Sequence, residues 1–433
     1  MKIEINDNFK WHHSLTIKMM LLAFLGLFLL APLEMIKSII RERQKTSEEV
    51  KKEITTQWAG KQIISGPVLN IPVRITPVKK EAEPYKTIFH LMPEKLIIAG
   101  SIQTEKRHRS IYQAVVYNGE MNISGSFKIP EINTGENQEI LWNEAYYSIG
   151  ISDNRGIKGT VIMSDATAEN EAVPGLNDSE LFSSGITFPA IVSKDKNSIP
   201  FSVKLSISGS ESLGFTPLGK TTEISINSPW SSPGFNGKFL PVERTLNESG
   251  FSAKWMITNL NRNFPQSWTG KSFNPEGDSF GVDFVLMVDH YQKSLRSAKY
   301  GILFIALTFL ALIFAELATG EIIHLFQYIL VALGLVLFFS LLNSLSEHTG
   351  FNLAYIISAS STIALISLFL NGLIKKPKTV ILISGLLVFL YSFIFILLTL
   401  NDYAYLAGNI GLFVLLSVTM ILSVRLRLFR KEL

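Results

Sequence analysis

Six long apolar runs constrain what this chain can fold into more than any other feature of the sequence. They carry few or no charged residues and lie at Leu15–Leu33, Tyr300–Leu317, Leu325–Leu342, Leu353–Ile374, Val380–Leu400 and Tyr405–Val424. Each is near the ~20 residues that a helix needs to cross a bilayer. Because every backbone polar group in lipid must be paired within the chain, we predict six transmembrane helices.

The first run also has features of a cleaved signal peptide, since Lys18 stands near its start and its centre is apolar. The run is long for a signal peptide, however, and the residues that follow it, Pro32–Met35, offer no small-residue cleavage site. We therefore interpret it as an uncleaved anchor and keep the signal peptide as the alternative.

Basic residues in the short loops predict the orientation in the membrane. Lys and Arg gather between the fourth and fifth runs and after the sixth, at Lys375, Lys376, Lys378, Arg425, Arg427, Arg430 and Lys431. The other loops, Ser344–Asn352 and Asn401–Asp402, carry none. Cytoplasmic loops are the basic ones, so both termini are predicted to be cytoplasmic and the segment Arg41–Lys299 extracytoplasmic. Lys293, Arg296 and Lys299 oppose this locally, but long translocated segments follow the charge rule weakly.

Composition excludes several classes of protein. The net charge of +4 is too small to indicate a nucleic-acid partner beyond the ordinary basic bias of cytoplasmic loops. The chain has no cysteine, so the polar segment must be stable without disulfides, and zinc sites built on thiolates are excluded.

The polar segment begins with a predicted helix and continues with strands. Ile39–Ala59 lacks Pro and Gly, and an apolar stripe recurs every four residues at Val50, Ile54 and Trp58. It is either a stalk that couples the membrane to the domain or a helix packed on a sheet. From Pro67 onward short alternating strands are separated by Gly, Pro, Asn and Ser, which predicts an all-β, antiparallel sandwich-like domain. Within it, Asn118-Gly119 predicts a hairpin turn between Ser110–Tyr117 and Met121–Ile129.

The predicted organisation has six parts. They are a cytoplasmic N-terminus (1–14), a first transmembrane helix (15–40), a helical stalk (41–66), a periplasmic β-rich domain (67–299), a five-helix transmembrane bundle (300–424) and a basic cytoplasmic tail (425–433).

A dense series of short motifs runs through the chain. The polar segment contains Trp58, Gly66-Pro67, Arg107, Arg109, Ile111, Tyr112, Gly214–Thr222, Phe239–Pro241, Gly250–Trp255, Asn259–Arg262 and Val288–Ser294. The apolar part adds Phe314–Leu317, His324, Gln327-Tyr328, Ser344–His348 and Gly350–Tyr355. Over nearly its whole length the sequence resembles the CreD family of bacterial inner-membrane proteins. One departure is Ser231–Gly234, where the family pattern has a turn containing histidine.

The resemblance implies a place in the inner membrane and a link to envelope integrity, stress response and colicin tolerance. It implies no enzymatic activity. Acidic residues such as Asp153, Asp283 and Asp289 have no spacing that would make a hydrolytic pair, and no nucleophile motif is present. We therefore expect a non-enzymatic protein without catalytic residues, cofactor or metal.

Four ionisable residues at the ends of apolar runs are candidate functional residues: Glu316, His324, Glu347 and His348. Ionisable groups within a membrane are costly and often functional, and His with carboxylate suits a proton or metal site. The alternative is that they cap helices and anchor the membrane interface. The small polar run Ser358–Thr362 likewise reads either as a polar path or as close helix packing.

Two functions from different classes remain open. The first is an envelope protein that binds or senses something through its periplasmic domain, with the bilayer and envelope proteins as partners. The second is a transporter or lipid-handling protein with its site in the bundle. A charged cavity at mid-depth would favour the second. The sequence indicates neither a ligand nor an oligomeric state.

Overall fold

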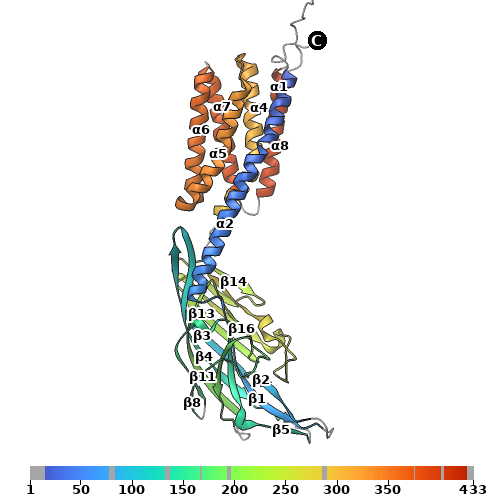
Figure 1. Ribbon diagram of the computed structural model, residues 1–433, viewed down its shortest axis with the longest axis vertical. Helices are drawn as coiled ribbons and strands as arrows, with labels where there is room; N and C mark the ends of the chain where they lie inside the picture. The colour runs from blue at the N-terminus through green and yellow to red at the C-terminus, as the bar shows by residue number, and fades with distance from the viewer. Residues whose placement is uncertain are drawn as a thin grey trace, which may run out of the picture. The chain divides into compact units, whose positions relative to one another are not determined.

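The structure, a computed structural model, describes residues 15–77, 83–131, 137–165, 168–192, 197–284, 290–374, 376–400 and 404–426 (Figure 1). The chain divides into two compact units: Met1–Ser47 with Val288–Leu433, here the helical unit, and Glu48–Met287, here the β unit. The predicted N-terminus 1–14 and the tail beyond residue 426 lie outside the described residues.

A helix lies at each of the six apolar runs. The helices are α1 (Leu15–Phe28), α2 (Leu30–Trp58), α3 (His290–Lys299), α4 (Gly301–Thr319), α5 (Leu325–Thr349), α6 (Phe351–Leu373), α7 (Pro377–Thr399) and α8 (Ala404–Leu426). Among the described residues, four helical segments are long and apolar enough to cross a bilayer, or five if α3 and α4, which meet at a 43° bend, form one span. The total of six spans stays a prediction.

Aromatic side chains form the centre of the helical unit. The ring centroid of Tyr391 lies 4.6 Å from that of Phe304 and 4.8 Å from that of Phe338, and the Tyr355 hydroxyl donates to the Tyr391 carbonyl at 2.8 Å. Lipid tails are as apolar as these side chains, so the hydrophobic effect does not drive the helices together. Close aromatic packing and this hydrogen bond stabilise the contacts between α4, α5, α6 and α7 instead.

The β unit consists of two sheets. The first has the order β14-β18-β12-β1-β6-β10-β9, with β2 and β5 also paired to β1, and β17 paired to β2. Its strands are β1 (Gln62–Ile75), β2 (Tyr85–Leu91), β5 (Gln138–Ile140), β6 (Tyr146–Ile151), β9 (Val173–Pro174), β10 (Gly185–Pro189), β12 (Ser212–Phe215), β14 (Pro233–Gly237), β17 (Ser267–Thr269) and β18 (Phe280–Phe284).

The second sheet has the order β15-β16-β13-β3-β4-β11-β7-β8. Its strands are β3 (Lys95–Arg109), β4 (Tyr112–Lys128), β7 (Ile157–Asp165), β8 (Glu169–Glu171), β11 (Ser198–Ser210), β13 (Thr221–Ser228), β15 (Glu243–Asn247) and β16 (Gly250–Thr258). The predicted all-antiparallel arrangement needs a correction, because β1 pairs with β12 in parallel and β13 pairs with β3 in parallel. In each parallel pair the two strands are distant in the sequence. Short hairpin connections join antiparallel strands and cannot produce a parallel pair.

Side chains at every second strand position pack together in one core between the sheets. In β11 the buried positions are every second residue from Ile199 to Ile207, while the residues between them face solvent. Trp255 and Trp268 lie in this core, and Trp230, Phe235 and Phe239 pack against it partly buried.

The predicted helical stalk is too long at its C-terminal end. Helix α2 ends at Trp58, and β1 already begins at Gln62, inside the predicted range 41–66. Gly60 ends the helix and its carbonyl accepts from the Ser210 N–H at 3.1 Å, so the chain enters the sheet directly. The end of α2 is packed on the β unit, since Trp58 Nε1 donates to the Tyr117 carbonyl at 3.3 Å.

The predicted hairpin at Asn118-Gly119 is wrong. Both residues lie inside β4, which pairs without interruption with β3 and with β11. A Cβ on Gly119 would come within 2.8 Å of Ile102 Cδ1, so the glycine serves close packing instead of a turn. Asn118 accepts from the Ser208 hydroxyl at 2.7 Å. The actual turn lies at Ser110, which has a φ of 56°.

The self-contained core predicts that the β unit folds without the transmembrane helices. We expect a fragment spanning residues 45–289 to give a β-type circular dichroism spectrum and one cooperative melt in buffer without detergent. Reductant should leave that melt unchanged, because the chain contains no cysteine. Chelator should also leave it unchanged, because no three potential metal ligands are grouped among the described residues. A disordered spectrum would contradict an independent core.

Candidate functional site

Glu316, the first candidate residue, forms an ion pair with Lys18. The lysine lies on α1 and the glutamate near the end of α4, and the side chains are 20% and 19% exposed. Lys18 Nζ also donates to the Ile323 carbonyl at 2.7 Å, and the Tyr328 hydroxyl donates to Glu316 Oε2 at 3.3 Å. The cluster therefore joins α1, α4 and the start of α5 through one charged centre.

Sequence reasoning missed Lys18 as the partner of Glu316. Lys18 was considered only as a feature of a possible signal peptide, and 298 residues separate it from Glu316. A signal was present, since each is the lone charged residue of a largely apolar segment and such groups tend to pair.

The other candidates do not join this cluster. His324 is the N-cap residue of α5, and its backbone N–H donates to Gln327 Oε1 at 2.8 Å. The residue is exposed. Glu347 accepts from the Tyr291 hydroxyl at 3.2 Å, and the neighbouring His348 is exposed. In the part of the chain that the structure describes, no three His, Asp or Glu side chains are grouped so that they could hold a metal ion. These contacts suit helix capping and helix packing.

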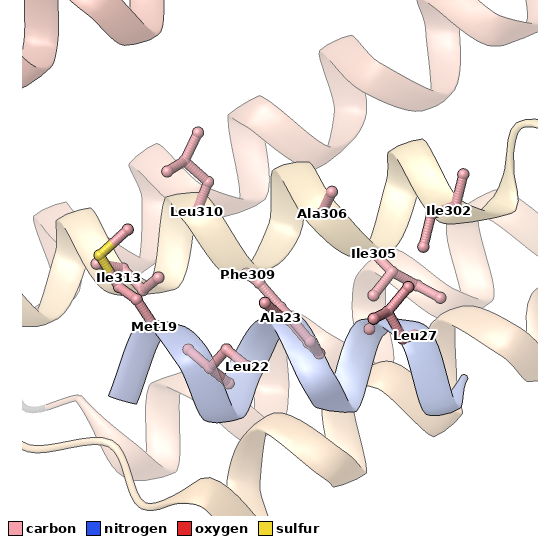
Figure 2. A pocket seen from close by; sticks show the side chains of 11 residues that line it. Met19, Leu22, Ala23, Leu27, Ile302, Ile305, Ala306, Phe309, Leu310 and Ile313 are labelled. Atoms are coloured by element: carbon pink, nitrogen blue, oxygen red, sulfur yellow. The ribbon is translucent and has the colours of Figure 1, made fainter. Parts of the chain in front are cut away.

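The helical unit contains two apolar grooves among its described residues. Figure 2 shows one of about 250 Å³ between α1 and α4, lined by hydrocarbon side chains such as Leu22, Phe309 and Ile313. A second, of about 550 Å³, lies among α4, α7 and α8, and Thr308 is its one hydroxyl-bearing residue. Neither is lined by a charged residue, so they suit hydrocarbon chains and offer no group for proton or ion transfer.

Several buried polar atoms of the helical unit have no hydrogen-bond partner among the described residues. They include atoms of Ser294 and Ser297 on α3, Thr308 on α4, Asn343 on α5 and Ser358 on α6. Buried polar groups are normally satisfied, and ordered water is a usual partner. Small hydroxyl side chains also allow helices to approach closely, which is the packing interpretation of the Ser358–Thr362 run.

The β unit has its own buried polar site around His90, which sequence reasoning did not single out. The ring is completely buried, with Nδ1 2.7 Å from Asn70 Oδ1 and Nε2 3.0 Å from Glu180 Oε2. Burial lowers the pKa of His90, while the hydrogen bond to Glu180 and the charges of Asp178 and Glu180 act in the opposite direction. The three residues tie β2 and β1 to the loop before β10.

A second polar cluster lies where α2 enters the β unit. The Arg155 guanidinium contacts the Asp153 carboxylate at 2.6 Å and holds the pKa of that carboxyl well below its usual range. Asp153 also accepts from the Gly60 N–H at 3.0 Å, and Arg155 Nη1 donates to the Thr56 carbonyl at 3.0 Å. Because every partner is a backbone group or the other member of the pair, the cluster has a structural role.

These features define an integral membrane protein with a large β unit between its apolar helices in the sequence. The family model described as inner membrane protein CreD matches residues 14–428. Inner membrane protein CreD of Escherichia coli (strain K12) is 30% identical over 408 residues, which are 92% of this chain and 90% of that protein. The chain belongs to the CreD family.

The Lys18–Glu316 pair predicts a specific loss of stability. Glu316→Gln leaves the ammonium group without its counter-ion, and we expect the helical unit to lose roughly 1–3 kcal/mol. Exchange of both charges, Lys18→Glu with Glu316→Lys, should recover part of that loss. The measurement is the thermal loss of helical circular dichroism in detergent.

Glu321→Gln is the matched control, since Glu321 lies in the loop between α4 and α5 and outside the cluster. Equal losses in Glu316→Gln and Glu321→Gln would show that the ion pair does not stabilise the helical unit.

Proposed function

We propose that this protein contributes to envelope integrity or the stress response by binding through an extracytoplasmic β unit, without enzymatic activity. In this proposal the helical unit anchors the β unit in the inner membrane, and both termini are cytoplasmic. The observation that carries the proposal is the β unit itself. It is a complete two-sheet body with its own core, placed in the sequence between apolar helices.

The described grooves of the helical unit support this choice. A transport site was expected to appear as a charged cavity, and both grooves are lined by apolar residues apart from Thr308. The candidate residues at helix ends contact Lys18 and Tyr291 in arrangements that serve helix contacts.

One observation favours the second candidate function, a transporter or lipid-handling protein. Buried polar side chains on α3, α4, α5 and α6 have an atom without a hydrogen-bond partner among the described residues. Water molecules bound to those atoms would form a polar path through part of the bundle.

The orientation predicts which positions a membrane-impermeant thiol reagent can reach. The chain contains no cysteine, so single replacements at the exposed positions Asn122, Thr349 and Lys378 give an unambiguous readout. In intact spheroplasts we expect labelling at Asn122→Cys and Thr349→Cys, and labelling at Lys378→Cys only after lysis. The reverse pattern would place the β unit in the cytoplasm.

The proposed function predicts that the β unit matters more than the ionisable residues at helix ends. Glu347→Gln and His348→Asn keep side-chain shape and remove charge. We expect near-normal survival of cells under detergent challenge, because exposed interactions contribute only about 1 kcal/mol or less. Deleting the β unit while keeping the helices should abolish protection.

Protein levels in the membrane, followed by immunoblot, are the control for both kinds of variant. If the two conservative changes eliminate protection at unchanged level and deletion of the β unit does not, the site lies in the helical unit.

A further inference from the structure

A two-stranded arm extends beyond the rest of the second sheet. The partner strand β13 stops pairing with β3 at Ser101, and β11 stops pairing with β4 at Val116. From Ile102 to Val115 the two strands pair only with each other, and this segment is here called the arm. Figure 1 shows it as the teal hairpin beside α2.

The end of the arm is basic and exposed. Lys106, Arg107, His108 and Arg109 follow one another along β3, and all four are exposed, as is Ser110 in the turn. Glu105 is the one acidic residue of the arm. Alternation along the strand places successive basic residues on opposite faces, so both faces of the arm carry positive charge.

Contacts with α2 fix the direction of the arm. The Arg107 guanidinium lies 5.0 Å from the Trp58 ring centroid, and Arg109 Nη1 lies 2.5 Å from Glu53 Oε1. Moving from Arg107 to Arg109 therefore follows α2 from Trp58 back to Glu53, toward the N-terminal end of the helix. On the other side, Lys106 Nζ lies 5.6 Å from the Trp230 ring centroid. Packing on both faces holds the arm in place.

A cleft of about 570 Å³ lies between the arm and α2. Its lining includes Arg107, His108, Arg109 and Trp58. Lys158 Nζ lies 5.7 Å from the Trp58 ring centroid, so two cations flank that indole. Glu53 and Glu105 each contact a single guanidinium nitrogen, and a guanidinium has five N–H donors. The guanidinium groups that line the cleft therefore keep N–H donors that can bind the oxygen atoms of a phosphate group.

The β unit is never far from a bilayer, since apolar helices precede and follow it in the sequence. This tether gives lipid headgroups a high effective concentration at any basic surface of the unit. On the basis of the function proposed above, we propose that the arm binds anionic phospholipid headgroups of the membrane that anchors the chain. Residues Arg107, Arg109, Ile111 and Tyr112, which carry part of the family resemblance, all lie on it.

The test uses the full chain in nanodiscs, with the turn residue Ser110→Cys carrying a fluorophore that brominated lipid chains quench. We expect quenching in nanodiscs that contain phosphatidylglycerol, little quenching in pure phosphatidylcholine, and loss of quenching at high salt. A cysteine at exposed Ser198, at the end of β11 remote in sequence from the arm, should stay unquenched in every case.

Charge variants distinguish binding by the arm from general electrostatic attraction between the β unit and an anionic membrane. Lys106→Gln with Arg107→Gln and Arg109→Gln should reduce quenching to the phosphatidylcholine level, because three charges near an anionic surface change such an equilibrium about 100-fold. Lys128→Gln with Lys204→Gln and Lys254→Gln removes equal charge from the same sheet and should have no effect. Arg107→Lys with Arg109→Lys, which keeps charge, should retain most of the quenching.

Equal quenching in the two lipids, or equal loss in the two triple variants, would overturn the proposal. Tryptophan fluorescence and melting of each variant show whether the β unit is folded. The proposed function is judged separately by deletion of the β unit, so it can survive when the arm fails this test.

Discussion

The junction at which α2 becomes β1 is the constraint on which the rest of the β unit depends. Within four residues the chain changes from helix to buried strand, and the last helical carbonyls must find partners there. Arg155 donates to the Thr56 carbonyl, and the Ser210 hydroxyl donates to the Ala59 carbonyl at 2.7 Å. The Gly60 N–H donates to the Asp153 carboxylate. Gln62 then donates to the carbonyls of Asp153 and Ser208. Ser208 and Ser210 lie on β11 of the second sheet, and Asp153 and Arg155 lie in the turn that follows β6 of the first sheet, so these contacts join the end of α2 to both sheets.

The two units solve the problem of stability by different means. The β unit buries a single core between its sheets, so the hydrophobic effect stabilises it at every alternate strand position. The helical unit gains little from moving apolar side chains out of lipid. Its specificity rests on shape and on a few polar contacts, of which the Lys18 ammonium with Glu316 is the strongest type. Burying a pair of charges in a membrane has a large free-energy cost, and removing one partner is destabilising because the other charge is left without its counter-ion. This pair therefore fixes which helices meet.

The sequence was sufficient for the position of each apolar helix, since ~20 apolar residues have few other stable forms in lipid. It was also sufficient for the two-sheet character of the β unit. The strand order could not be predicted from the sequence. Strand β1 pairs with β12, more than half of the unit's sequence away, and no local pattern encodes that partner. The candidate Glu316 was identified and its partner was not, for the same reason: the contact is tertiary.

The failed hairpin prediction explains how the arm arises. Asn-Gly favours a tight turn only where the flanking chain can fold back, and here Gly119 is buried under Ile102 and Ile207 while Asn118 accepts from Ser208. Tertiary packing of the sheet therefore overrides the local preference and keeps β4 straight. A turn at Asn118 would have divided β4. The chain turns at Ser110 instead, so β3 and β4 extend past the last residues that pair with β13 and β11, and Lys106–Arg109 lie on that extension. Gly119, which looked like a turn signal, thus keeps β4 continuous between the sheet and the arm.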